Sequence, residues 1–216
     1  SRNKHMTGDS TRCVKAVAAE GSPGSPLQQG PVFAAPYLLG EDETGEVDTY
    51  ARASNPGWRA LEAALATLEG AVAARVVGSG MSAITVALRA FSRPGATVVV
   101  PADGYYQVRA YAQDFLAGHG AMVRELSVAE FGDGTLRSIL AGAGDNAVVL
   151  AETPSNPGLD IVDLRATAEL CRAAGALLLV DNTTATPLGQ TPLALGADIV
   201  VASGTKSLSG HSDLLF

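Results

Sequence analysis

The chain of 216 residues is 47% hydrophobic and 17% charged, which is a globular composition and excludes an intrinsically disordered protein. Its formal net charge is -7, with 22 acidic and 15 basic residues, so it lacks the basic excess with which proteins bind nucleic-acid phosphates. Two cysteines, Cys13 and Cys171, fit no metal-ligand spacing and indicate a reduced cytoplasmic protein. No apolar run is long enough to span a bilayer, and no signal peptide opens the chain.

The first part of the chain is predicted to lie outside the folded core. Its opening residues, SRNKHM, resemble an expression-vector remnant that ends at the native Met6. Residues 7–49 are rich in Gly, Pro, Ser and acidic side chains, which favour turns and polyproline II over packed structure. This segment is either an arm that lies over another subunit or a mobile tail. We therefore expect a remnant and an extended arm over residues 1–49 and a folded domain over residues 50–216.

Regular hydrophobic spacing begins after this segment. Asn55 is a typical helix cap, Pro56 is favoured at the first helical position, and leucines then recur at helical spacing until Gly70. Short runs rich in Val and Leu follow and predict strands at Arg75–Val77, Thr97–Pro101, Ala147–Glu152, Leu177–Asp181 and Ile199–Ala202. The segments between them predict helices at Gly80–Phe91, Tyr106–Gly118 and Leu164–Ala174.

Strands that are hydrophobic throughout are typical of sheets covered on both faces. Their alternation with helices predicts an α/β fold with a mostly parallel sheet flanked by helices. Ligands of such sheets bind at the carboxyl ends of the strands. A polar segment follows each of the five predicted strands, in the order SGMSA, DGYY, ETPSNP, DNTTATP and SGTKSLSG. We therefore expect one functional site at this edge of the sheet.

The first polar segment leaves two cofactor classes open. Gly78, Gly80 and Ala83 fit the GxGxxA pattern of dinucleotide-binding proteins, and Asp103 lies at about the spacing expected for a ribose contact. The same turn into a helix N-terminus can bind any phosphate, because free N–H groups and the helix dipole converge there. It can also be a tight strand–helix turn with no ligand.

Two later residues favour a different cofactor. Asp181 ends LLLVD, the strongest predicted strand, and its carboxylate could pair with a protonated ring nitrogen, although it could equally cap the next turn. Lys206 follows a turn that contains Ser203 and Thr205, whose hydroxyls could bind a phosphate while the amine reacts with an aldehyde. A lone lysine is usually an ordinary surface residue, but these neighbours indicate a reactive amine.

The segments YARASNP, SGMSA, ETPSNP, VDNTTATP and SGTKSLSGHSDLL occur in this order along the chain. Together they resemble the Cys/Met metabolism family of pyridoxal-phosphate (PLP) enzymes, the group of cystathionine γ-synthase, cystathionine γ-lyase and methionine γ-lyase. The resemblance runs from about Tyr50 to Phe216. It implies the large domain of the fold-type I PLP-dependent transferase architecture, which is aspartate aminotransferase-like, with pyridoxal 5'-phosphate as the cofactor.

The resemblance also implies the site residues. Lys206 would hold the cofactor as a Schiff base and transfer protons, while Tyr105 would stack on the pyridine ring and protonate the departing sulfur. Asp181 would pair with the pyridine nitrogen. The other implied contacts are Gly80, Met81, Ser203 and Thr205 at the phosphate, Asn156 near the phenolic oxygen, and Tyr50 and Arg52 at the phosphate of a neighbouring subunit. Such sharing implies a dimer as the smallest active unit and a homotetramer, a dimer of dimers, as the assembly.

Two features depart from the family pattern. After Tyr105 the family usually has a Gly-rich stretch, and methionine γ-lyases have a cysteine near it, whereas this chain has Tyr106, Gln107 and Val108. The chain also stops at Phe216 in DLLF, an apolar run that predicts the start of a strand. We therefore expect that the C-terminal domain, with the arginine that holds the substrate carboxylate in this family, is not in this chain.

The implied function is a PLP-dependent carbon–sulfur lyase that acts by γ-elimination on a sulfur amino acid of the methionine or cystathionine type. It would give a 2-oxo acid, ammonia and a thiol. A γ-replacement synthase of the same family is the first alternative, since no residue selects water over an incoming thiol. An NAD-dependent oxidoreductase and a truncated, non-catalytic partner are further alternatives. We expect an amino-acid substrate, and neither a nucleic acid nor a membrane as a partner.

Overall fold

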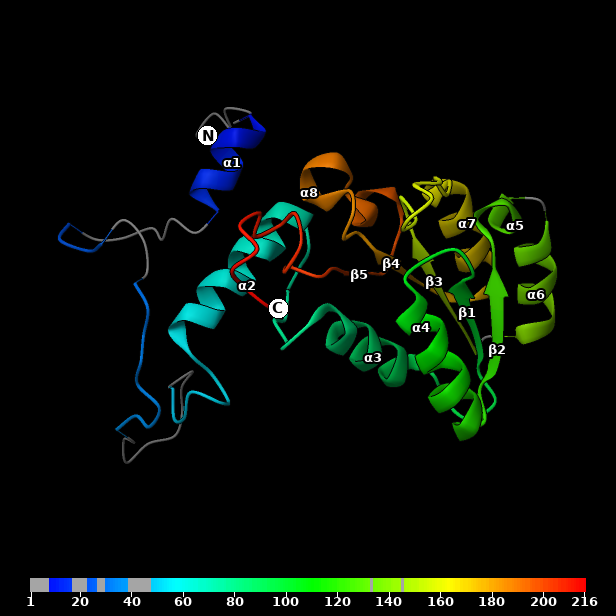
Figure 1. The fold of residues 1–216 in the computed structure, drawn as a ribbon, viewed down its shortest axis with the longest axis horizontal. Helices are drawn as coiled ribbons and strands as arrows, with labels where there is room; N and C mark the ends of the chain where they lie inside the picture. The colour runs from blue at the N-terminus through cyan, green and yellow to red at the C-terminus, as the bar shows by residue number, and fades with distance from the viewer. Residues whose placement is uncertain (1–7, 17–22, 27–29, 39–47, 133, 145) are drawn as a thin grey trace. The chain divides into compact units, whose positions relative to one another are not determined.

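The computed structural model describes residues 8–16, 23–26, 30–38, 48–132, 134–144 and 146–216 (Figure 1). The chain divides into two compact units, Ser1–Val76 and Val77–Phe216, each of which is considered by itself. The predicted vector remnant that ends at Met6 and parts of the predicted arm lie outside the described residues. The expected division into an arm over residues 1–49 and a domain over residues 50–216 stays a prediction.

The C-terminal unit is built on a sheet of five parallel strands. The strands are β1 (Thr97–Pro101), β2 (Met122–Leu126), β3 (Ala147–Glu152), β4 (Leu177–Asp181) and β5 (Ile199–Val201), in the spatial order β2-β1-β3-β4-β5. Strands β1 and β3 are buried at every position, as the continuous apolar runs predict. The order reverses between β1 and β3, and parallel sheets with such a switch point bind ligands beside it.

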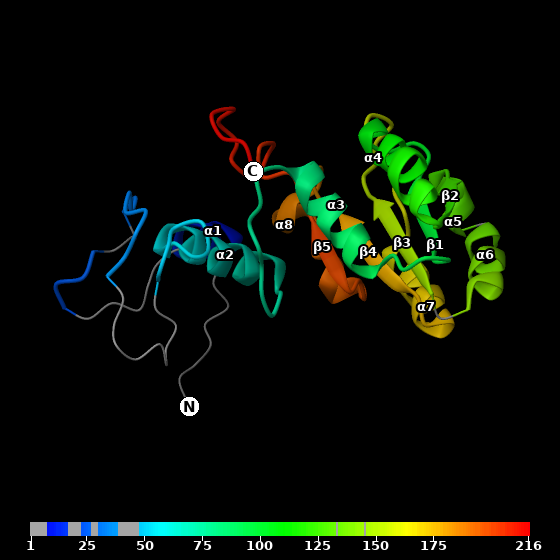
Figure 2. The same ribbon diagram turned by 90° about the horizontal axis from the view of Figure 1, so that it is seen from below.

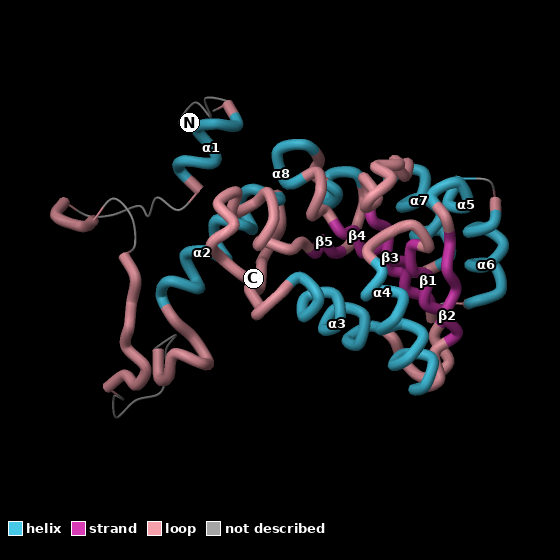
Figure 3. The backbone as a smooth tube through the Cα atoms, viewed as in Figure 1, coloured by secondary structure: helices cyan, strands magenta, loops and turns pink. Residues whose placement is uncertain are grey.

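Helices cover both faces of this sheet (Figure 2). The α-helices are α3 (Gly80–Phe91), α4 (Tyr106–Tyr111), α5 (Val128–Gly132), α6 (Thr135–Ala143), α7 (Leu164–Ala174) and α8 (Thr186–Gly189). Helix α4 continues as the π-helix η1 (Ala112–Leu116) and the 3-10 turn η2 (Ala117–His119), and a second 3-10 turn, η3 (Pro192–Leu195), precedes β5. Helices α3 and α4 share one buried cluster with Val98, Val148 and Leu179 of the strands. Helices α5, α6 and α7 share the other with Val99 and Val149. The predicted α/β fold with a mostly parallel sheet flanked by helices is confirmed, with strands between two layers of helices (Figure 3).

Strand β2 was not predicted from the sequence, and its position explains why. Among the described residues it is an edge strand that pairs with β1 alone, and most of its residues are exposed or half-buried. Its sequence, MVREL, therefore carries Arg124 and Glu125 in place of a continuous apolar run. The predicted start of a strand in DLLF is wrong, because residues 213–216 pair with no strand of the described part of the chain and Phe216 bonds to Thr205.

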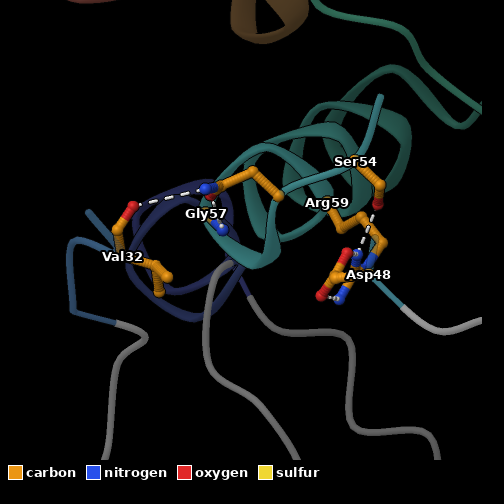
Figure 4. A network of polar contacts seen from close by, with 6 residues as sticks. Val32, Asp48, Ser54, Gly57 and Arg59 are labelled. Carbon is orange, nitrogen blue, oxygen red and sulfur yellow. Dashed lines mark hydrogen bonds and ion pairs between the residues drawn. The ribbon is translucent and has the colours of Figure 1, made fainter. Parts of the chain in front are cut away.

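The N-terminal unit contains α1 (Asp9–Lys15) and α2 (Pro56–Glu69). Helix α2 begins and ends as predicted, since the Asn55 side chain accepts a hydrogen bond from Gly57 N at 2.8 Å and Gly70 adopts φ 69 at its end. Asn55 also donates through Nδ2 to Val32 O at 3.2 Å. Beside it, Arg59 pairs with Asp48 (Figure 4). These contacts tie the start of α2 to the segment before it.

The predicted strand Arg75–Val77 is wrong, because these residues form no regular secondary structure. Glu62 of α2 binds this segment. Its carboxylate accepts a hydrogen bond from Val76 N at 3.0 Å and pairs with the Arg75 guanidinium at 3.0 Å. A backbone N–H that donates to a side chain is not available for a ladder between strands.

Candidate active site

Four polar segments follow the carboxyl ends of β1, β3, β4 and β5, and a fifth opens α3. Contacts between these segments show which of the predicted residues come together. The segments after β4 and β5 are joined through Asp181, Thr183 and Ser203, and α3 touches Ser203. The segments after β1 and β3 are joined through Tyr105 and Glu152. Among the predicted residues, the structure therefore brings Gly80, Asp181 and Ser203 together, and it places Tyr105 against Glu152.

Asp181 is a buried carboxylate at the end of β4, with 8% of its surface exposed. Its Oδ1 accepts hydrogen bonds from Thr183 N at 2.9 Å and from Thr183 Oγ1 at 2.6 Å. None of the ion pairs among the described residues involves it. Burial raises the pKa of Asp181, and the two Thr183 hydrogen bonds oppose that shift. A buried carboxylate of this kind is stabilised by a cation that binds beside it.

Thr183 links the two expected halves of the cofactor site and was missed by the sequence reasoning. Its hydroxyl donates to Asp181 and accepts a hydrogen bond from Ser203 N at 2.8 Å. The loop after β5 is thereby fixed against the end of β4. Only its place in VDNTTATP, two residues after the predicted carboxylate, could have indicated this role.

The N-terminus of α3 lies directly against Ser203. The first two helical residues are Gly80 and Met81, whose N–H groups have no carbonyl partner within the helix. Ser79 caps the helix by accepting a hydrogen bond from Ser82 N at 3.1 Å. A Cβ on Gly80 would lie 2.7 Å from the Ser203 Cβ and 2.9 Å from its Cα, so only glycine allows this approach. Free N–H groups beside a hydroxyl are a suitable seat for a phosphate.

Replacing Gly80 with alanine should therefore open this seat. The added Cβ would force α3 and the Ser203 loop apart, which we expect to lower the free energy of unfolding by about 1–3 kcal/mol. We also expect at least about tenfold weaker binding of a phosphate-bearing cofactor, because the N–H groups and the hydroxyl would no longer converge. Equilibrium cofactor titration and urea unfolding measure the two effects.

Gly78→Ala is the matched control, since a Cβ on Gly78 would have no atom within 4 Å. It lies in the same turn but outside the contact with Ser203. Equal losses of affinity in both variants would contradict the role assigned to the close approach.

Lys206 lies in the turns that follow β5, with its side chain exposed. Its backbone N donates to Ser203 O at 3.2 Å, so Lys206 and Ser203 lie in one turn. Thr205 has a different partner from the expected one: its Oγ1 donates to Phe216 O at 3.1 Å and accepts from Phe216 N at 3.0 Å. Contact of the Thr205 hydroxyl with a phosphate stays a prediction.

Tyr105 follows β1 and forms the N-cap of α4. The residue is 38% exposed, and its ring meets Tyr106 edge-on, with ring centroids 5.3 Å apart. Asn156, after β3, is exposed. Tyr50 and Arg52 lie in the N-terminal unit, where the Arg52 guanidinium stacks over the Tyr50 ring at 4.9 Å. The roles of these last two residues toward a neighbouring subunit stay predictions.

Glu152 is the second buried carboxylate of this edge and was also missed, since it stands within the predicted strand. It pairs in register with Asp181 of β4, and its Oε2 accepts a hydrogen bond from Tyr105 N at 2.7 Å. Burial raises the pKa of Glu152 to about 7, with further contributions from Asp181 and Asp103 that the backbone N–H groups of Tyr105 and Asn156 oppose.

This raised pKa predicts a pH-dependent stability. Between pH 4.5 and about 7 the unfolded chain releases the Glu152 proton before the folded chain does, so the carboxylate destabilises the fold as the pH rises. The free energy of unfolding of Glu152→Gln is compared with that of the wild type at each pH. We expect this difference to grow in favour of Glu152→Gln by about 2 kcal/mol as the pH rises from about 5.5 to 8. Urea unfolding of the cofactor-free protein at both pH values measures it. A constant difference between the two proteins would contradict the shift.

Comparison with known proteins identifies the group to which this site belongs. The sequence profile described as Cys/Met metabolism PLP-dependent enzyme matches residues 15–216. The chain belongs to this family. It is 45% identical over 218 residues to a Streptomyces coelicolor protein named "putative cystathionine gamma-lyase", covering 99% of this chain and 54% of that one. It is 39% identical to the L-methionine gamma-lyase of Pseudomonas putida over 165 residues, covering 76% of this chain and 40% of the relative.

A solved structure of the family agrees with the fold. Cystathionine gamma synthase from Xanthomonas oryzae pv. oryzae, in complex with aminoacrylate and cysteine, superposes with a TM-score of 0.88 at 32% identity. The match covers 97% of this chain and 53% of that chain. The chain thus spans about half the length of the curated relatives and solved structures that it matches. The predicted fold-type I architecture is confirmed.

The family's cofactor, pyridoxal phosphate, fits the residues that are present. A protonated pyridine nitrogen is the kind of cation that the buried Asp181 carboxylate lacks among the described residues. The approach of Gly80 to Ser203 gives a seat that suits its phosphate. The described residues contain no group of three His, Cys, Asp or Glu side chains that could hold a metal ion. No helix in the described part of the chain is long and apolar enough to cross a membrane.

The dinucleotide alternative is wrong. Its fingerprint requires a strand immediately before the Gly-rich turn, and the residues before Gly78 form none. Asp103, the candidate ribose ligand, accepts a hydrogen bond from Val128 N at 3.0 Å and so fixes the start of α5.

Proposed function

We propose that this chain supplies the cofactor-binding part of a PLP-dependent carbon–sulfur lyase. The enzyme would act by γ-elimination on a sulfur amino acid of the methionine or cystathionine type and release a 2-oxo acid, ammonia and a thiol. The observation that carries the proposal is the buried Asp181 carboxylate, joined through Thr183 to the loop that carries Ser203 and Lys206. The similarity to relatives named as γ-lyases supports the choice of reaction.

The cofactor is proposed to be held at both of its ends. The N–H groups of Gly80 and Met81 and the Ser203 hydroxyl would bind its phosphate. Thr205 would be a further donor once its hydroxyl exchanges the hydrogen bond to Phe216 O for one to the phosphate. Asp181 would accept a hydrogen bond from the protonated pyridine nitrogen and keep that proton in place. Asn156 would lie near the phenolic oxygen. When bound, pyridoxal phosphate supplies an electron sink for the pair released when the substrate loses its Cα proton.

Two residues are proposed to move protons in the reaction. The Lys206 amine would bind the cofactor aldehyde in the resting enzyme and, once the substrate amine displaces it, would remove the Cα proton. It would deliver that proton to the cofactor C4′, which frees the amine to remove a proton from Cβ. Tyr105 would donate a proton to the sulfur as the Cγ–S bond breaks, so that the thiol leaves neutral. Water then completes the reaction by releasing the 2-oxo acid and ammonia.

The test uses the full-length protein loaded with pyridoxal phosphate. Incubation with methionine or with cystathionine should produce a 2-oxo acid and ammonia in equal amounts, together with a thiol. If neither substrate gives a 2-oxo acid, the lyase assignment fails.

A γ-replacement synthase is the second candidate, favoured by the match to a solved cystathionine gamma synthase. It would bond an incoming thiol to the substrate carbon from which the leaving group departs, where the lyase uses water to release ammonia. Adding a thiol to the same assay separates the two: a new thioether without a 2-oxo acid would favour the synthase.

The assembly and the location are also proposals. A dimer in which Tyr50 and Arg52 reach the phosphate of the neighbouring subunit, paired into a homotetramer, would fit the family pattern. Their exposed, stacked arrangement is compatible with an anion contact. A cytoplasmic location is supported by the free thiols of Cys13 and Cys171.

A further inference from the structure

The turn that carries Tyr105 is held from its N–H side by a buried acid. Glu152 Oε2 accepts the hydrogen bond from Tyr105 N, and a Cβ on the preceding Gly104 would lie 2.5 Å from the same oxygen. It would also lie 2.8 Å from the Pro101 Cγ. The backbone of the turn is therefore fitted against the Glu152 carboxylate, with no room for any side chain at residue 104.

The same turn is held from its carbonyl side by Arg109. This side chain reaches back from α4 and donates through Nη1 to Gly104 O at 2.8 Å. It is 28% exposed, and its only ion-pair contact among the described residues is a distant one, 3.9 Å from Glu125. The peptide unit between Gly104 and Tyr105 is thus bonded at both its oxygen and its nitrogen.

The position of Glu152 gives this contact a relation to the cofactor site. Glu152 and Asp181 are register partners on β3 and β4, and Tyr105 follows β1 on the other side of β3. One buried side chain on β3 therefore stands between the residue proposed to bind the pyridine nitrogen and the residue proposed to stack on the ring. The switch point between β1 and β3 lies at the same place.

We propose that Glu152 and Arg109 are positioning residues that fix the Gly104–Tyr105 peptide, so that the Tyr105 ring is held where the pyridine ring binds. This inference rests on the proposed role of Tyr105, but the hold on the peptide can be measured without it. An amide that accepts the same hydrogen bond should replace Glu152, because the carboxylate acts here through its oxygen and not through its charge.

The first measurement is amide hydrogen exchange at Tyr105 in the cofactor-free, full-length protein. Glu152→Ala should exchange at least about tenfold faster at this amide, because the hydrogen-bond acceptor is lost. Glu152→Gln should restore the wild-type rate within about twofold. Leu140→Ala, which removes a buried side chain of α6 in the cluster on the other face of the sheet, is the control for general destabilisation and should leave this amide unchanged relative to its neighbours.

The second measurement is a double-mutant cycle on the dissociation constant of pyridoxal phosphate. Glu152→Ala should weaken binding between about threefold and tenfold, which is the range expected for loss of an aromatic stacking contact. In a Tyr105→Ala background the same change should weaken binding by less than about twofold, because there is no ring left to position. A purely structural role would give the same factor in both backgrounds.

The outcomes separate this inference from the proposed function. Unchanged exchange at Tyr105 in Glu152→Ala, a loss in Glu152→Gln as large as in Glu152→Ala, or equal factors in the two backgrounds would overturn it. If Tyr105→Ala alone leaves cofactor affinity unchanged, the proposed role of Tyr105 fails, while the exchange rates still decide whether Glu152 holds the turn. Should Glu152→Ala not fold, Arg109→Ala is expected to shift the exchange rate and the cycle in the same directions, and its failure to do so overturns the inference.

Discussion

Replacing Lys206 with alanine should lower the rate of 2-oxo acid formation by about 10³-fold in the full-length enzyme. The variant would lose both the amine proposed to bind the cofactor aldehyde and the base proposed to remove the Cα proton. Proton transfer by a positioned side chain contributes about 10²–10⁴-fold to a rate. Borohydride treatment followed by intact-mass measurement should fix the cofactor to the wild type and leave Lys206→Ala without it.

Lys15→Ala is the matched control, because Lys15 is an exposed lysine at the end of α1 in the N-terminal unit. It should retain both the covalently fixed cofactor and the activity. A Lys206→Ala variant that still carries borohydride-fixed cofactor at another lysine would refute the assignment, whatever its residual activity.

Replacing Asp181 with asparagine should lower activity by about 10- to 100-fold, because a hydrogen bond to a charged group contributes about 1.5–3 kcal/mol. The amide can still accept the two hydrogen bonds from Thr183, but it cannot hold a proton on the pyridine nitrogen. The stability of the cofactor-free protein should not fall with the activity. Burial raises the pKa of Asp181, so removal of this carboxylate should leave the melting temperature at neutral pH unchanged or higher.

Asp163→Asn is the matched control for this exchange of a carboxylate for an amide. Asp163 caps α7 by accepting a hydrogen bond from Ala166 N at 3.0 Å, and asparagine caps helices about as well as aspartate. Activity and melting temperature should both stay close to those of the wild type. A fall in activity of Asp181→Asn that is matched by a fall in its melting temperature would indicate damage to the fold in place of an electrostatic role.

The central part of the fold could be predicted from sequence, and burial explains this success. Strands β1, β3 and β4 have the predicted bounds because each is enclosed on both faces and its apolar run is continuous. Prediction from local sequence failed where tertiary contacts determine the secondary structure. Glu62 binds Arg75 and the Val76 N–H, so the run Arg75–Val77 does not pair as a strand. Strand β2 lies exposed at the sheet edge and contains charged residues, so it lacks the continuous apolar run of a buried strand.

The candidate site divides in the same way. Residues whose role depends on their own chemistry, such as Lys206 and Asp181, were recognisable as candidates from their motifs. Thr183 and Glu152 act by holding other residues, and their partners come from different strands. No spacing within one segment encodes such a contact, so it becomes visible only when the register of the strands is known.

The contact between Gly80 and Ser203 joins the first helix of the C-terminal unit to the loop after its last strand. Every strand of the sheet lies between these residues in sequence, so the entropy of closing this long loop opposes the contact until the sheet has assembled. The site proposed for the cofactor phosphate is therefore expected to form late on the folding pathway. Binding of the cofactor would then occur only in fully folded chains, so it could be used to measure complete folding. By mass action it would also shift the equilibrium toward the fully folded state.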